Sequence, residues 1–231
     1  MINSTLDKRL LSCADYVRAG AVFADIGTDH GYLPIFLLKS GKIESAYLTD
    51  VNVGPLNSAK ENAHAENLSD KCFFMLTDGA AALSGCGITD YAVCGMGGEL
   101  IASIIDAAPH LKSADVRLIL QPMTKQAYLR RYLFSHGFTV LSERYTAADG
   151  KYYVTMMAEY TGECTDIDDA TAEIGIDIPH EADRVEYIGY LKARKNAYAK
   201  AKEGRERGGL SFSSEERILS LISEKISESE R

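Results

Sequence analysis

Apolar runs long enough to cross a membrane are missing from this chain of 231 residues. No run approaches the roughly 18 consecutive apolar residues that a membrane-spanning helix needs. The first residues also lack the charged, apolar and small-residue regions of a signal peptide. We therefore expect a cytoplasmic protein with no membrane partner.

Metal-binding patterns are missing as well. The five cysteines form no Cys-x-x-Cys pair and fall mostly in apolar runs, and the five histidines show no ligand spacing. Buried, reduced thiols are the simplest interpretation, so no metal site is expected. The formal net charge of −8 argues against a protein that binds nucleic acid non-specifically. The length suffices for one buried core and an appendage.

The most informative segment is residues 24–34, which read ADIGTDHGYLP. An apolar run over residues 21–24 leads into it and an apolar-periodic segment over residues 33–38 ends it. The pattern predicts a strand, a turn and a helix, the entry to a Rossmann-like nucleotide site. The turn lacks the G-x-G-x-x-G spacing of dinucleotide loops and carries Asp25 and Asp29, which would repel a pyrophosphate. A ligand with a cationic end and no phosphate fits better, which favours S-adenosylmethionine over NAD.

Strand-like and helix-like segments alternate through the first 160 residues, which predicts a mostly parallel sheet with helices on both faces. The last two strands are joined by a polar turn containing Asp149 and Gly150, too short for a crossover helix, so they should form a hairpin. This layout, with seven strands, is the class I S-adenosylmethionine-dependent methyltransferase fold, an α/β fold. The expected strands cover residues 21–24, 45–51, 72–77, 91–95, 117–121, 138–141 and 152–160, and the expected helices residues 4–18, 33–38, 54–66, 98–107 and 125–136.

Two further aspartates stand at predicted strand ends. Asp50 would accept hydrogen bonds from ribose hydroxyls, or it caps the next helix, although Asn52 can do that equally well. Asp78 would accept from an exocyclic adenine amine, but Asp-Gly is also a common turn. Open α/β sheets bind ligands at this carboxyl edge. We expect the cofactor to contact Asp25, Gly27, Thr28, His30, Tyr32, Leu33, Asp50, Asn52, Asp78, Gly79 and Gly95.

The fourth predicted strand ends in a glycine-rich sequence, residues 95–98 (GMGG). Either the backbone approaches a ligand closely there, or it makes a tight turn that packs against the neighbouring strand. In the first interpretation Met96, Gly97 and Gly98 form the floor for a methyl acceptor, and the flexible thioether suits a flat ring. The Asn/Asp-Pro-Pro-aromatic loop of many methyltransferases that act on exocyclic amines is missing, which favours a ring nitrogen as acceptor.

Six motifs support a family resemblance: Arg9-Leu10 and residues 24–34, 50–56 (DVNVGPL), 95–98, 118–122 (LILQP) and 150–153 (GKYY). Together they resemble the bacterial tRNA (adenine-N1)-methyltransferase family, whose members methylate the adenine at position 22, in the D-arm, with S-adenosylmethionine. The resemblance covers about residues 5–160. It implies a methyltransferase domain over residues 1–160, followed by a helical, coiled-coil-like domain that docks tRNA. We expect a monomer without an obligate protein partner.

The C-terminal third has a different pattern. Residues 161–179 predict an acidic connector, and residues 180–231 predict two helices joined by a glycine turn. Residues 213–216 (SSEE) match a capping box for the second helix. Between residues 191 and 207, seven basic residues outnumber two acidic ones. Such a run is usually a solvated helix face, but beside a nucleic-acid acceptor it favours phosphate docking by Lys192, Arg194 and Lys195.

Methylation of a ring nitrogen needs little acid–base assistance, because the N1 lone pair of adenine is unprotonated at neutral pH. Alignment of that lone pair behind the methyl–sulfur bond should provide most of the catalysis. The methylated ring becomes cationic, so we assign Asp25, with Asp29 second, to stabilise it. Asp25 could instead order the loop or bind the cofactor ammonium. The base must leave its stack, and Tyr32 and Met96 are candidate surfaces to receive it.

Two alternatives to tRNA methylation stay open. The first is an S-adenosylmethionine-dependent methyltransferase with a small-molecule or protein acceptor, in which the basic helix has no role. The second is a non-catalytic nucleoside-binding module that uses the helical hairpin to bind a protein.

Overall fold

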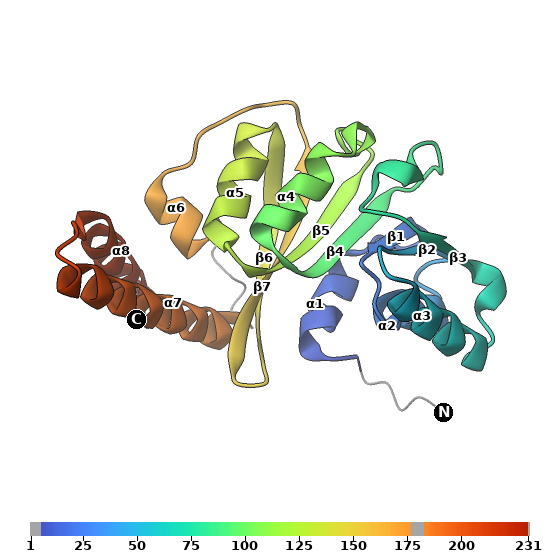
Figure 1. The fold of residues 1–231 in the computed structure, drawn as a ribbon, viewed down its shortest axis with the longest axis horizontal. Coiled ribbons are helices and arrows are strands. Elements are labelled where there is room, and N and C mark those ends of the chain that lie inside the picture. Colours follow the sequence, from blue (N-terminus) through green and yellow to red (C-terminus); the bar gives the residue numbers. More distant parts are fainter. Residues whose placement is uncertain (1–5, 177–182, 231) are drawn as a thin grey trace.

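In the part of the chain that the structure describes, residues 6–176 and 183–230, seven strands form one sheet (Figure 1). Across the sheet their order is β3 (Cys72–Leu76), β2 (Ser45–Asp50), β1 (Val22–Ile26), β4 (Asp90–Gly97), β5 (Arg117–Thr124), β7 (Lys151–Tyr160) and β6 (Phe138–Ala148). Strands β1 to β5 are parallel, and β7 is antiparallel to both of its neighbours. This computed structural model confirms the predicted fold class.

Helices cover both faces of the sheet, because each central strand is apolar on both sides. Phe23 belongs to one core, with α1 (Lys8–Tyr16), α2 (Tyr32–Lys39) and α3 (Val53–Ala65). The next residue, Ala24, belongs to the other core, with α4 (Gly98–Asp106) and α5 (Gln126–Ser135). Short 3₁₀ turns lie at η1 (Ser69–Lys71), η2 (Ala81–Leu83) and η3 (Pro109–Leu111).

The strand order reverses beside β1, which pairs with β2 on one side and with β4 on the other. The connections from β1 and from β4 therefore leave the sheet in opposite directions and open a crevice at its carboxyl edge. Open α/β sheets bind their ligands at such a reversal. The fold thus fixes where a site should lie before any side chain is considered.

The β6–β7 hairpin is longer than the sequence pattern predicts. Its turn is Asp149-Gly150, with φ of 49° and 71°, the two positive values of a type I′ turn. The expected strand ended at Leu141, but β6 continues to Ala148. The predicted end of this strand was therefore wrong: the strand continues through Glu143, which is buried against a cation.

That cation is Arg130 of α5, which is fully buried. Its Nε donates to Glu143 Oε1 at 2.6 Å, and its Nη1 donates to the Ala172 carbonyl at 2.7 Å. Glu143 also accepts from the Tyr145 hydroxyl at 2.7 Å and from the Ile176 backbone amide at 3.2 Å. A buried ion pair persists only when its remaining donors and acceptors are satisfied, as they are here.

The predicted connector contains a helix, α6 (Asp169–Ile174), whose last three residues are buried. It is followed by α7 (Arg184–Arg207) and α8 (Ser213–Ser229), which lie side by side beyond β6, at the opposite end of the sheet from β3 (Figure 1). The start of the predicted helical region, residues 180–182, lies outside the described residues, as do residues 4–5 of the expected N-terminal helix.

The expected capping box at the start of α8 is not formed. Its N-cap is Phe212, and no side chain caps the helix. Helix α7 is nevertheless fixed to the sheet, because the ring of Tyr145 in β6 lies 4.7 Å from that of Tyr187 and 5.1 Å from that of Tyr190, and α8 packs against α7 and α6. No helix among the described residues is both long and apolar enough to cross a membrane.

Candidate nucleoside-binding site

A cavity of about 730 Å³ opens at the carboxyl edge of the sheet, where the strand order reverses. The ends of β1 to β4 form its base, and the first turn of α1 and the tip of the β6–β7 hairpin form its sides. Thirteen of the predicted site residues line it: Asp25, Gly27, Thr28, Asp29, His30, Tyr32, Leu33, Asp50, Asn52, Asp78, Gly79, Gly95 and Met96.

The turn after β1 uses its backbone amides internally. The amides of Gly27 and Thr28 both donate to the Thr49 carbonyl at 2.9 Å, so they are not available to cradle a phosphate. Gly27 has a φ of 73°, and a Cβ there would lie 2.1 Å from the Met96 Cε. The Met96 methyl group can move aside, so the positive φ is what favours glycine at position 27. The local geometry therefore agrees with the exclusion of a pyrophosphate ligand.

Asp25 lies at the centre of the site and is only 5% exposed. The Thr28 hydroxyl donates to its Oδ2 at 2.7 Å. Burial raises the pKa of Asp25 from 3.8 to about 6, and the charges of Asp50 and Asp29 add to this effect. A carboxylate whose charge is this poorly solvated is strongly stabilised by a cationic ligand.

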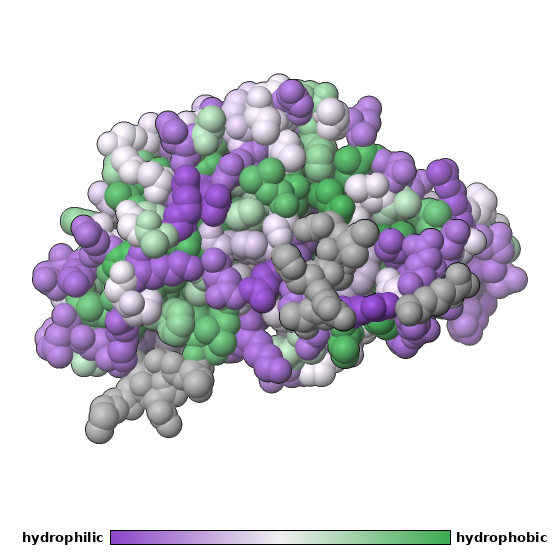
Figure 2. Space-filling model, turned by 180° about the vertical axis from the view of Figure 1, so that it is seen from behind, coloured by the Kyte–Doolittle hydropathy of each residue, from purple (hydrophilic) through white to green (hydrophobic). Residues whose placement is uncertain are grey.

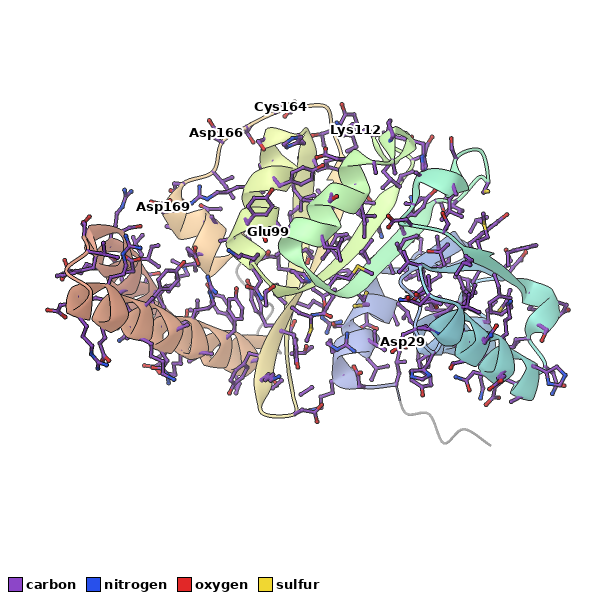
Figure 3. The ribbon with its side chains drawn as sticks, viewed as in Figure 1. Asp29, Glu99, Lys112, Cys164, Asp166 and Asp169 are labelled. Carbon is purple, nitrogen blue, oxygen red and sulfur yellow. The ribbon has the colours of Figure 1, made fainter. Side chains whose placement is uncertain are left out.

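The second loop aspartate is placed differently. Asp29 has a φ of 49°, and its side chain is 70% exposed. Its Oδ1 lies 3.6 Å from Nε2 of His30, whose ring stacks on Tyr32 with 5.1 Å between the ring centroids. Figure 3 shows Asp29 in the lower part of the view and Lys112 near the top. Asp29 therefore belongs to the mouth of the cavity, whereas Asp25 belongs to its floor.

The two remaining acidic strand ends also face the cavity. Asp50 Oδ1 accepts from the Asn52 backbone amide at 2.8 Å, within the turn that precedes α3. The N-cap of α3 is Asn52 rather than Asp50, so Asp50 does not cap that helix. Asp78 is exposed, and Gly79 behind it has a φ of 65°. Both carboxylates therefore keep oxygens free for a ligand.

The glycine-rich end of β4 divides between two roles. Gly95 and Met96 line the cavity, but Gly97 and Gly98 do not. A Cβ on Gly98 would lie 2.5 Å from the Lys125 carbonyl oxygen, and one on Gly97 would lie 3.2 Å from Thr124 Oγ1. The expectation that Gly97 and Gly98 form the acceptor floor therefore has no support from the lining of the cavity. They allow β4 to pack closely against the end of β5, which was the alternative interpretation.

Several cavity residues were not predicted. One of them, Arg9, is held by Gln121, a fully buried residue of β5 that does not itself line the cavity; the Gln121 Oε1 accepts from the Gly95 amide at 3.0 Å and from Arg9 Nη1 at 2.9 Å. Arg9 reaches the cavity from α1, 112 positions earlier in the chain. Both residues belong to motifs of the family resemblance, Arg9-Leu10 and residues 118–122, to which no chemical role was assigned. The other lining residues that were not predicted are Asp7, Leu10, Ile26, Thr49, Val51, Thr77, Cys94, Leu100, Ile104, Met123, Ala148, Asp149 and Tyr153.

The basic residues predicted on the C-terminal helix lie outside the cavity. Lys192 pairs with Glu230 at 2.7 Å, and Arg194 pairs with Glu173 of α6 while stacking on Tyr198. Arg194 is consequently a structural contact. Lys195 is exposed and has no ion pair within the described residues. Figure 2 shows hydrophilic side chains gathered over these two helices.

The described residues contain no group of three or more His, Cys, Asp or Glu side chains that could hold a metal ion. All five cysteines are free thiols; Cys13 and Cys72 are buried, whereas Cys164 is exposed on the connector (Figure 3). The site is thus built from carboxylates, backbone groups and apolar side chains.

A parallel sheet that ends in an antiparallel hairpin, with an acidic nucleoside cavity at the strand reversal, defines a Rossmann-like methyltransferase. In agreement, the family described as "Methyltransferase domain" matches residues 6–156. The chain is 34% identical over 154 residues to the tRNA (adenine(22)-N(1))-methyltransferase of Bacillus subtilis, a match that covers 67% of this chain and 65% of that protein.

Solved structures are similar over nearly the whole chain. A Streptococcus pneumoniae protein proposed as a tRNA (m1A22) methyltransferase, in complex with S-adenosyl-L-methionine, is 30% identical with a TM-score of 0.81 and covers 96% of this chain and 100% of its own. The B. subtilis m1A22 tRNA methyltransferase is 26% identical with a TM-score of 0.78 and covers 98% and 97%. The chain belongs to the methyltransferase-domain family and, within it, to the tRNA (adenine(22)-N(1))-methyltransferase family.

Proposed function

We propose that this protein transfers the methyl group of S-adenosylmethionine to N1 of an adenine in tRNA, at position 22 in the D-arm. The observation that carries the proposal is the convergence of Asp25, Asp50 and Asp78 on one cavity beside a turn whose amides are already bonded. Family membership supports the choice of substrate.

The residues of the cavity fit S-adenosylmethionine. The buried Asp25 carboxylate suits its cationic ammonium or sulfonium, Asp50 can accept from the ribose hydroxyls, and Asp78 can accept from the adenine amine. No phosphate is present in this ligand, so the occupied amides of Gly27 and Thr28 are no obstacle. When bound, S-adenosylmethionine supplies a methyl group activated by a positively charged sulfur.

The chain's own contribution is alignment and charge. Adenine N1 needs no base, so the cavity has to place its lone pair in line with the methyl group and exclude water. The ring gains a positive charge as it is methylated, and Asp25 is the better placed carboxylate to stabilise it. Its burial keeps its field unscreened, whereas the exposed Asp29 is screened by water. Tyr32 and Met96 provide surfaces against which the extruded base can stack.

The helical hairpin is proposed to dock the tRNA, as a C-terminal domain over residues 180–231 that follows the methyltransferase domain of residues 1–160 and the acidic connector of residues 161–179. Lys195 and Lys200 are exposed on α7 and support this role. Lys192 and Lys202 are paired with acidic residues of the C-terminal region, and Arg194 is held by Glu173. Phosphate docking should therefore depend most on Lys195 and Lys200.

The decisive experiment uses tRNA that lacks the modification, together with the full-length protein and S-adenosylmethionine labelled on its methyl group. Mass mapping of the nucleosides should find a single labelled N1-methyladenosine, at position 22. Transfer to a small molecule or a protein but not to tRNA would favour the first alternative activity. Cofactor binding without any transfer would favour a binding module. We also propose that the protein is cytoplasmic and monomeric. Light scattering at increasing protein concentration tests the second point, because assembly would raise the measured molar mass.

A further inference from the structure

The cavity wall is strongly acidic and holds a single guanidinium. Six aspartates line it, whereas Arg9 is the only arginine or lysine that lines it in the described part of the chain. RNA is a polyanion, and carboxylates at short range repel its phosphates. A tRNA segment that enters this cavity needs a cationic contact there, and Arg9 is the residue able to supply it.

Two neighbours hold the Arg9 guanidinium beside the end of β4. Its Nη1 donates to Gln121 Oε1 at 2.9 Å, and its Nη2 donates to Asp7 Oδ2 at 3.2 Å. The same Gln121 oxygen accepts from the Gly95 amide at 3.0 Å, so the guanidinium is tied to the strand end that precedes Met96. An arginine has five N–H donors, and these two bonds leave the others for a ligand.

Gln121 fixes the guanidinium without cancelling its charge. A glutamate in this buried position would form an ion pair with Arg9, as Glu143 does with Arg130. The neutral amide orients the guanidinium and leaves its charge for an anion from outside the chain. Asp7 compensates that charge only in part, because its side chain is 48% exposed and water screens the pair.

Apolar side chains complete this side of the cavity. Leu100 and Met123 line it and are 51% and 38% exposed, with Met96 and Tyr153 beside them in the wall. A flat base can lie against such a surface. An arginine close to the base would oppose the positive charge that the ring gains on methylation, so its partner should be an anionic part of the nucleotide.

We propose that Arg9 binds a phosphate that flanks the target adenine, and that Gln121 is a positioning residue that orients Arg9 for this contact. This inference rests on the proposed function, since it takes tRNA as the substrate. In this proposal the nucleotide that enters the cavity is bound by Arg9 of α1. The lysines of the C-terminal helices would contact other parts of the tRNA.

The test compares Arg9→Gln, Arg9→Lys and Gln121→Glu with the wild type, using unmodified tRNA. We expect Arg9→Gln to raise KM for tRNA about tenfold, with kcat and the affinity for S-adenosylmethionine changed less than twofold. The slope of log Kd for tRNA against log salt concentration should flatten by about 0.7–0.9, the value of one phosphate contact. Gln121→Glu should also raise KM for tRNA, while its circular dichroism spectrum stays that of the wild type. Arg9→Lys keeps the positive charge, so its salt slope should lie between those of Arg9→Gln and the wild type.

Lys112→Gln is the matched control, because it removes one positive charge from an exposed position far from the cavity (Figure 3). A folded Arg9→Gln variant with unchanged KM and salt slope would overturn the inference. So would a fall in kcat alone, which would assign Arg9 to the chemistry instead. If the wild type methylates no tRNA, the proposed function fails, and the salt slope of tRNA binding still decides the role of Arg9.

Discussion

Asp25 and Thr28, three residues apart in one turn, are joined by a 2.7 Å hydrogen bond in which the Thr28 hydroxyl donates to the buried carboxylate. This bond lowers the pKa of Asp25, but burial raises it by more, to about 6. The turn thus holds a carboxylate whose ionisation is costly in the absence of a ligand. Proteins tolerate such a cost mainly at sites where it serves function.

The stability of the ligand-free protein should reflect this cost. The folded-state pKa of Asp25 is above its ordinary value of 3.8, so protonation favours the folded state. The stabilisation is complete below about pH 4 and is lost as the pH rises through 6. Urea unfolding should find that the wild type gains about 1 kcal/mol more than Asp25→Asn between pH 7.5 and pH 5. An equal gain in both proteins would mean that Asp25 ionises as it does in the unfolded chain.

The same variant separates catalysis from cofactor binding. If Asp25 stabilises the cationic ring in addition to binding the cofactor, Asp25→Asn should lower kcat more than tenfold and weaken the affinity for S-adenosylmethionine by a clearly smaller factor. Single-turnover kinetics and calorimetry measure the two quantities. A comparable loss of affinity would make Asp25 a residue that binds the cofactor, and the catalytic assignment would be withdrawn.

Asp78→Ala should weaken S-adenosylmethionine binding by about 1–3 kcal/mol, because it leaves a polar edge of the bound ligand without its acceptor. Calorimetry is the measurement, and Asp166→Ala, an exposed position on the connector (Figure 3), is the control. If both variants bind as the wild type does, Asp78 is not part of the site.

Substitution of the exposed lysines of α7 should weaken tRNA binding without changing protein stability or cofactor binding. Lys195→Glu combined with Lys200→Glu should raise KM for tRNA and flatten the salt dependence, while Tm and cofactor affinity stay at the wild-type values. The reason is that neither lysine makes an ion pair within the described residues. Unchanged tRNA binding in a folded double variant would show that the basic helix is only a solvated face.

Arg194→Glu should behave in the opposite way to the lysine variants. It would place a second carboxylate beside Glu173, which also accepts from the Tyr198 hydroxyl at 2.6 Å. Because Glu173 is buried, this unpaired charge should cost several kcal/mol and lower Tm markedly. Thermal unfolding monitored by circular dichroism is the test. Arg207→Glu, on the same helix, should lower Tm only slightly, because its ion pair with Glu203 is exposed.

The parts of the site that follow strands could be predicted from the sequence. Asp25, Asp50 and Asp78 end successive parallel strands, and the geometry of the sheet brings such ends together whatever the side chains do. The sequence left the role of Gly97 and Gly98 open, because a glycine permits close approach without indicating the partner; here the close neighbours are Thr124 and Lys125. The contact between Arg9 and Gln121 joins residues on α1 and β5, and no local pattern encodes a pairing over that separation.

The buried pair of Arg130 and Glu143 has a consequence for how this chain can be divided. Arg130 donates to the Ala172 carbonyl and Glu143 accepts from the Ile176 amide, so both ions depend on a segment beyond the last strand. A fragment cut after Tyr160 would retain every residue of the cavity but expose this pair and lose two of its hydrogen bonds. The family match ends at residue 156, but the unit that folds extends at least to Ile176.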